Sequence, residues 1–261
     1  MIMRKAILGS VAVLAIAALA LASDPWKAKP YQQWDEKDVQ KILSDSPWSK
    51  MVQVEATWES SGSTPRSGMP QGSSAGSSGG SGGGGRGGMG GGGGSPSGGG
   101  PGMGGGSTAN PAPQAQFVLR WASSRTIREA ATRRQVIAGK MTQEQGEQQL
   151  SQAADAYQVM IQGSQMTPFQ NADEASIKAK SFLTTKKAKE KIEATKVEIE
   201  RSPDGKTIYS VLISFPQKTA TGEGTIGADE KGVEFTCSVS GVNLKTSFDI
   251  SKMYDAQGRD I

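Results

Sequence analysis

The 261-residue chain contains no histidine and only one cysteine. Without histidine it lacks the commonest general base, the commonest metal ligand and the usual activator of a nucleophilic serine or cysteine. These absences exclude Ser-His-Asp catalysis, Cys-His catalysis and ordinary zinc sites. Carboxylate pairs and Ser-Lys pairs remain open as catalytic groups.

The single cysteine also excludes an internal disulfide. Cys237 shares one face of an alternating run with Val233, Phe235 and Val239, which predicts a strand with a buried thiol. A reactive thiol or an intermolecular disulfide is the alternative. Because no internal disulfide stabilises the chain, we expect a hydrophobic core of reasonable size.

Neither sign of charge is in large excess. The formal net charge is +4, and it falls to +2 without Arg4 and Lys5, which is too mild to indicate a nucleic-acid partner. Residues 205–207 resemble the end of a phosphate-binding loop, but Glu200 stands where that motif requires glycine. We therefore predict no nucleic-acid partner and no bound cofactor.

Residues 1–22 have the pattern of a signal peptide. Arg4 and Lys5 precede an apolar run over residues 6–21, and residues 20–22 have the small-x-small pattern of a cleavage site. The run is shorter than the roughly 20 residues of a membrane-spanning helix, and a retained anchor is the alternative. We expect an exported chain, periplasmic or extracellular, with no transmembrane segment after cleavage.

Glycine is concentrated in one tract, since 24 of the 35 glycines lie between residues 61 and 110. Such a tract cannot bury enough apolar surface to offset the entropy lost on ordering, so residues 60–113 are predicted to be a disordered Gly/Ser/Pro-rich segment. Residues 51–58 before it and 117–121 after it both alternate like strands.

These two strands indicate how the chain is organised. Residues 23–59 are too few to form a stable core alone. We therefore expect them to form the N-terminal arm of a single domain with residues 114–261, with the two strands paired. The tract is then a long insertion, which is tolerated because the entropy of loop closure rises slowly with loop length.

Helix signals fall mainly in the first half of the chain. The expected helices start at Asp35, after Ser123 or Ser124, at Thr142, and at Asn171, which forms a capping box with Glu174. The first helix is expected to have one apolar face, made of Val39, Ile42 and Leu43. The second has one side made of Ile127, Ala130, Ala131, Arg134 and Ile137, and the third turns Leu150, Ala153 and Ala154 inward.

Strand signals occupy most of the second half. Residues 157–161 and 182–185 are predicted strands, and from residue 197 onward the alternation predicts antiparallel hairpins. The predicted fold class is therefore α+β, with helices mainly in the first half and an antiparallel sheet in the second half.

Four of the five tryptophans lie close together before the glycine tract: Trp26, Trp34, Trp48 and Trp58. One interpretation is that they pin the arm to its own domain, because each ring buries a large apolar area. The alternative is an exposed face that binds a partner through Trp26, Trp34 and Trp48.

Basic side chains form two further candidate surfaces. Arg125, Arg128 and Arg133 are predicted on the helix side opposite Ile127, either as a solvated face or as a site for an anion or partner. A dense set of lysines follows: Lys178, Lys180, Lys186, Lys187, Lys189 and Lys191. The lysines indicate either a charged edge that prevents aggregation or contact with an anionic envelope surface.

Three stretches carry a resemblance: Lys29-Pro30-Tyr31-x-x-Trp34 with Asp45-Ser46-Pro47-Trp48; Arg120-Trp121-x-Ser123-Ser124-Arg125-x-Ile127-Arg128-Glu129-Ala130; and Phe248 to Met253 with Gly258-x-Asp260-Ile261. Together they resemble a group of uncharacterised exported proteins of acidobacterial-type soil bacteria, in which the region between the first two stretches varies. The resemblance implies export and a single domain, and it transfers no catalytic residue.

These observations favour an exported, non-enzymatic binding or assembly module of the cell envelope, with an envelope protein or an anionic surface as its partner. The first alternative is a carboxylate-dependent hydrolase or lyase, whose acids would come from Glu55 and Glu59 or from Asp35, Glu36 and Asp38. The second alternative is a surface tether that acts through the glycine-rich tract.

Overall fold

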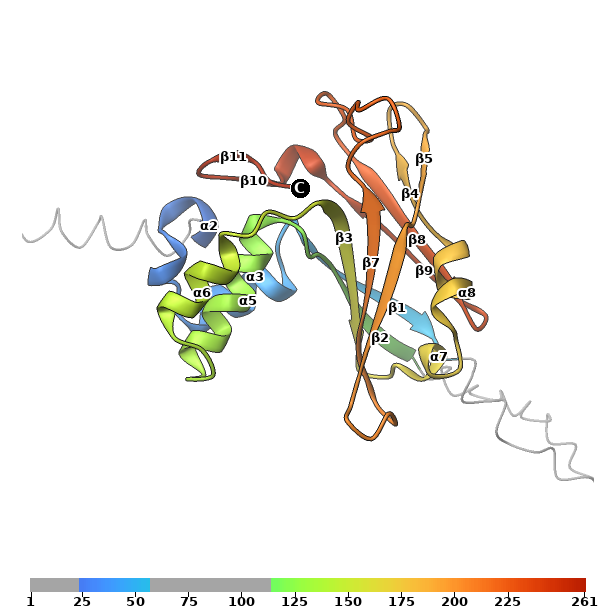
Figure 1. Ribbon diagram of the computed structural model, residues 1–261, viewed down its shortest axis with the longest axis horizontal. Helices are drawn as coiled ribbons and strands as arrows, with labels where there is room; N and C mark the ends of the chain where they lie inside the picture. Colours follow the sequence, from blue (N-terminus) through green and yellow to red (C-terminus); the bar gives the residue numbers. More distant parts are fainter. Residues whose placement is uncertain (1–23, 57–113) are drawn as a thin grey trace, which may run out of the picture. The chain divides into compact units, whose positions relative to one another are not determined.

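The computed structural model describes residues 24–56 and 114–261 (Figure 1). The predicted signal peptide, Trp58, Glu59 and the predicted insertion lie outside the described residues. Within them the fold is α+β, with helices mostly early in the chain and antiparallel strands mostly later, so the predicted fold class is confirmed.

The strands form two sheets and a short hairpin in which every neighbour is antiparallel. The five-stranded sheet has the order β1 (Ser49–Glu55), β2 (Gln114–Trp121), β3 (Ala156–Gly163), β7 (Ile208–Pro216) and β6 (Lys196–Arg201). The four-stranded sheet has the order β5 (Lys191–Glu193), β4 (Ser181–Thr185), β8 (Val233–Val239) and β9 (Val242–Phe248). The hairpin consists of β10 (Tyr254–Asp255) and β11 (Gly258–Arg259).

The two strands that flank the undescribed segment pair along their whole length. The register runs from Ser49 opposite Arg120 to Glu55 opposite Gln114, which confirms the predicted pairing. Inward-facing side chains alternate along β2, where Phe117 and Trp121 are fully buried. The period of two places these rings on the core side of the sheet.

The core lies between the two sheets, which pack face to face (Figure 1). Phe215 meets Phe235 edge-on with 6.2 Å between ring centroids, and Trp121 meets Phe248 at 5.2 Å. Cys237 is fully buried in this layer, and burial raises the pKa of its thiol to about 11. The prediction of a strand with a buried thiol is confirmed.

The helices gather mostly at one end of the sandwich (Figure 1). Their bounds are α2 (Pro25–Ala28), η1 (Tyr31–Gln33), α3 (Glu36–Ser44), α5 (Arg125–Ile137), α6 (Gln143–Leu150), α7 (Thr167–Gln170), α8 (Glu174–Ala179) and η2 (Ile250–Lys252). α5 packs against α3, α6 and η1, whereas α8 packs against β6 and β8. The helices α3, α5, α6 and η1 form the region that holds the candidate site.

Three helix details differ from the prediction. On α5, Thr132 is buried while Arg134 and Ile137 are exposed, because α6 approaches the Thr132 side so closely that a Cβ on Gly146 would lie 2.6 Å from the Thr132 methyl group. α6 ends at Leu150, so Ala153 and Ala154 lie beyond it. The cap of α8 is Asp173, not Asn171: its carboxylate accepts the Ser176 N–H at 2.7 Å.

Candidate functional site

The chain from Asp24 to Trp34 folds back on itself to form one wall of the site. The indole N–H of Trp34 donates to the carbonyl oxygens of Pro25 and Lys29, each at 3.2 Å. One indole therefore bonds to the backbone at both ends of α2. Trp26 packs edge-on against Trp48, with 5.4 Å between the ring centroids, and this contact anchors the wall to the core.

The end of the chain forms the second wall. The Trp48 indole donates to the Asp260 carbonyl oxygen at 2.6 Å. The Asp260 carboxylate accepts the backbone N–H groups of Arg125 and Thr126, at 2.6 and 2.9 Å, at the start of α5. These N–H groups have no partner inside the helix. Asp260, which lies 135 positions after Arg125, therefore caps the N-terminus of α5.

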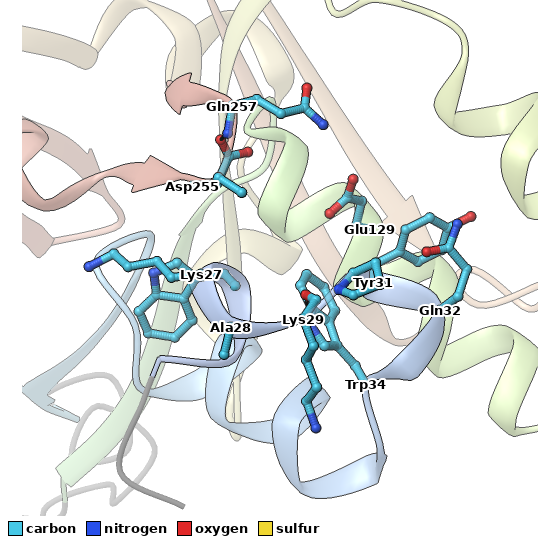
Figure 2. A pocket seen from close by; sticks show the side chains of 12 residues that line it. Lys27, Ala28, Lys29, Tyr31, Gln32, Trp34, Glu129, Asp255 and Gln257 are labelled. Atoms are coloured by element: carbon cyan, nitrogen blue, oxygen red, sulfur yellow. Dashed lines mark hydrogen bonds between the residues drawn. The ribbon is translucent and has the colours of Figure 1, made fainter. Parts of the chain in front are cut away.

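Together, α2–η1, α5 and the β10–β11 hairpin surround a cavity of about 510 Å³ (Figure 2). This volume lies within the ~300–1,000 Å³ of typical small-molecule sites. Its lining combines aromatic, amide and charged side chains, including those of Tyr31, Gln32, Trp34, Glu129, Asp255 and Gln257. The mixture suits a small polar molecule that also has an apolar or cationic part.

Glu129 is the distinctive group of this cavity. Figure 2 shows its carboxyl group projecting from α5 into the space between the hairpin residues Asp255 and Gln257 and the arm residue Tyr31. It makes no hydrogen bond or ion pair with any of the described residues. The pKa of Glu129 is raised to about 7, chiefly by burial; Arg125 and Arg128 lower it, and the Asp255 and Asp260 carboxylates raise it.

Asp255, the other carboxyl group in the cavity, is fully engaged. One oxygen accepts the Gln257 N–H at 2.7 Å, and the other accepts the Arg125 Nε–H at 2.7 Å and pairs with the Arg125 Nη2 group. Its side chain is only 7% exposed. Asp255 therefore shapes the hairpin turn and holds Arg125, which leaves Glu129 as the free acid.

The structure buries the three candidate tryptophans. Trp26, Trp34 and Trp48 are 5%, 2% and 0% exposed. The prediction that these rings form an exposed binding face is therefore wrong, because all three pack into the molecule's own core. Trp26 and Trp34 still line the cavity.

The arginines of α5 also bind within the chain, so the prediction of a solvated face is wrong. Arg125 pairs with Asp255, and Arg133 donates to the Trp34 carbonyl oxygen at 2.9 Å. Arg128 donates to carbonyl oxygens just after and at the end of α6, including that of Leu150 at 3.3 Å. This face is occupied because the arm, α6 and the C-terminal hairpin all pack around α5.

The lysine-rich segment surrounds α8 and the β4–β5 hairpin, and its lysines are exposed. β5 is an edge strand, and Lys191 on it pairs with Glu193 at 3.1 Å. Charged side chains on an edge strand oppose pairing with another chain. Contact of these lysines with an anionic envelope surface stays a prediction.

The carboxylates proposed for catalysis do not converge. Asp35 and Asp38 form a capping box in which each side chain accepts the other's backbone N–H at 2.9 Å, and Glu36 and Glu55 are exposed. Glu59 lies outside the described residues. The acids that do line one cavity are Glu129 and Asp255, and neither is among the predicted catalytic carboxylates.

Little in the sequence distinguishes Glu129 from a surface glutamate. The available signal is its position on α5 beside Thr126 and Thr132, both of which are buried. Recognising that signal requires knowing which elements cover the helix. Within the described ranges, no group of three or more acidic or cysteine side chains is placed to hold a metal ion.

No protein family model, curated protein or solved structure matches the chain. Among residues 24–56 and 114–261, no helix is both long enough and apolar enough to cross a membrane. Function is therefore inferred from the cavity and its side chains.

Replacement of Glu129 by glutamine should remove a pH-dependent loss of stability. Because the folded state raises the pKa of Glu129 from 4.5 to about 7, folding favours the protonated form, and stability falls as pH rises through that interval. We expect the loss to be about 1–2 kcal/mol, a value reduced for the partial exposure of the side chain. Glu129→Gln should equal the wild type at pH 4 and exceed it by that amount at pH 8.

Urea unfolding at a series of pH values measures this difference. Glu147→Gln, which removes an exposed glutamate of α6, is the matched control and should leave the wild-type pH dependence intact. If the free energy of unfolding changes equally with pH in Glu129→Gln and in the wild type, Glu129 is not desolvated in the folded protein.

Proposed function

We propose that the chain is an exported, non-enzymatic binding module of the cell envelope, and that the cavity beside Glu129 holds its ligand. The single observation that carries the proposal is a carboxyl group directed into a cavity of about 510 Å³ without a partner among the described residues. The Glu129 side chain is half-buried, and partial desolvation without a protein partner costs free energy. A bound ligand would supply the missing partner.

The hydrogen bonds of Asp255, the second carboxyl group in the cavity, favour binding over catalysis. Acid–base hydrolysis requires two carboxyl groups that can each reach the substrate. Both Asp255 oxygens already accept hydrogen bonds from Arg125 and Gln257, whereas Glu129 alone is free to contact a molecule in the cavity.

Cross-linking at the rim of the cavity tests the proposal. A photoreactive amino acid replaces Gln257, which is exposed at the cavity, or replaces Tyr209, a 50% exposed residue of β7 that serves as the control position. In envelopes of the source cell, we expect a specific adduct at position 257, none at position 209, and loss of the adduct when Glu129→Ala is added. Equal labelling at both positions, or no labelling at 257, would refute the site.

A carboxylate-dependent hydrolase or lyase is the second candidate. It is favoured by one observation: Glu129, whose pKa is raised to about 7, shares a cavity with Asp255, and an acid–base pair of this kind separates the two catalytic roles. The test is turnover of envelope material by the purified protein. Product formation that is abolished both by Glu129→Gln and by Asp255→Asn would establish this candidate, and activity that survives either change would exclude it.

A further inference from the structure

The charges that line the cavity are paired, with one exception. Lys29 pairs with Asp38 of α3 at 2.5 Å, and Lys27 pairs with Asp24 at 3.2 Å. Figure 2 shows both ammonium groups pointing away from Glu129. Arg125 and Arg128 lie near Glu129 on α5, but Arg125 is paired with Asp255, so Glu129 is the one charged group of the lining that forms no ion pair with another described residue.

An unpaired carboxylate selects a ligand by charge. An anionic ligand would lie beside Glu129 and Asp255 with no unpaired cation among the residues that line the cavity, and like charges in a partly desolvated site repel each other. A cationic ligand would make the missing ion pair. Charge-assisted hydrogen bonds of this kind are stronger than neutral ones.

Aromatic rings in the wall suit the same type of ligand. Tyr31 and Trp34 line the cavity, and the Tyr31 hydroxyl is already bonded to the Gln143 amide at 2.9 Å. This bond, in which the Tyr31 oxygen accepts the Gln143 N–H, holds the phenol against α6 while its ring lines the cavity. The face of an aromatic ring attracts ammonium and guanidinium groups, as the Lys41 ammonium 5.7 Å from the Trp26 ring centroid illustrates nearby.

We infer that the ligand of this cavity is an organic cation whose primary ammonium or guanidinium group pairs with the Glu129 carboxylate beside the Tyr31 ring. This inference rests on the proposed function and specifies the chemical class that the site accepts. The cavity of about 510 Å³ has room for the cationic group together with a small polar body. Gln32 and Gln257 lie on the lining to hydrogen-bond that body.

Binding of such a ligand should be linked to the ionisation of Glu129. The charged groups that face Glu129 are Arg125 and Arg128 on its own helix, and Asp255 and Asp260 of the C-terminal segment, while Tyr31 faces it from the arm. With a pKa of about 7, the binding-competent carboxylate is ~1% populated at pH 5 and about half populated at pH 7. Affinity should therefore rise about 50-fold over that range.

Matched pairs of probes test the ligand class by calorimetry and by the carboxyl ¹³C resonance of Glu129. The pairs are glucosamine with N-acetylglucosamine, and a lysine-containing tripeptide with its Nε-acetylated form, because acetylation removes the charge and keeps the rest of the molecule. Ethylammonium and guanidinium serve as minimal cations, and glucuronate serves as an anion. The sugar and peptide pairs distinguish an amino sugar from a protein side chain as the source of the cation.

We expect the cationic member of at least one pair to bind at least tenfold more tightly than its acetylated form, and to lower the pKa read from the Glu129 resonance. Glu129→Gln should abolish this preference and its pH dependence, and Glu174→Gln, which removes an exposed glutamate of α8 away from the cavity, should preserve both. Tighter binding of an acetylated or anionic probe would overturn the cation class while supporting the cavity as a site. Absence of binding by every probe, with no shift of the Glu129 resonance, would overturn both.

Discussion

Trp48→Ala should reduce the free energy of unfolding by about 3–5 kcal/mol, the range for truncating a fully buried large aromatic side chain. The Trp48 ring is 0% exposed and packs edge-on against Trp26. Its N–H also donates to the Asp260 carbonyl oxygen across 212 positions of sequence. The substitution therefore leaves a large cavity and separates the arm from the C-terminal segment, and urea unfolding measures the loss.

Two further variants assign the loss to its causes. Trp48→Phe keeps most of the ring and removes the N–H donor, so it should cost about 1–3 kcal/mol for the buried carbonyl left unpaired. Tyr209→Ala removes an aromatic ring that is 50% exposed and should cost less than about 1 kcal/mol. If Trp48→Ala costs no more than Tyr209→Ala, the arm does not pack as described.

Asp260→Ala should destabilise the protein by about 2–4 kcal/mol, because it leaves two N–H groups at the start of α5 without acceptors in a buried position. Asp260 is 5% exposed, and its two carboxylate oxygens accept the N–H groups of Arg125 and Thr126 separately. Loss of these bonds should also loosen the β10–β11 hairpin, which carries Asp255 into the cavity. We therefore expect weaker binding of the cavity's ligand as well as lower stability, measured by urea unfolding and calorimetry.

Asp249→Ala is the matched control for this substitution. Asp249 also accepts a backbone N–H as a helix cap, that of Ser251 at 3.2 Å, but its bond lies at the exposed surface beside η2. Its loss should cost about 0.5–1 kcal/mol and leave ligand binding unchanged. Comparable effects of the two substitutions would mean that the Asp260 carboxylate is not the buried cap of α5.

Local signals predicted the elements well where the responsible atoms lie within a few residues of each other. Asp35, Ser124 and Thr142 each cap the helix that follows through a bond to a backbone N–H three residues later, and such bonds depend on the local sequence alone. The cap at Asp173 was missed because Asn171 two residues earlier offers the same chemistry. Only the path of the chain from α7 to α8 selects between them.

The face of α5 could not be predicted in the same way. The spacing of its apolar residues identified Ile127 and Ala130 as buried, and both are. The burial of Thr132 and the exposure of Ile137 depend instead on where α6 packs. A helix surrounded by several elements buries polar side chains that periodicity assigns to solvent.

By itself, the sequence determined the chemistry that this protein lacks, the α+β class, and the pairing of β1 with β2, because residue types and a strand period of two are properties of the local chain. Only the tertiary structure decided that Glu129 lines a cavity without an ion pair to another described residue, that Asp255 is engaged, and that three tryptophans are internal. The walls of the cavity come from the N-terminal arm, α5 and the last residues of the chain. Desolvation and charge pairing arise when these distant segments meet, so neither can be derived from sequence neighbours.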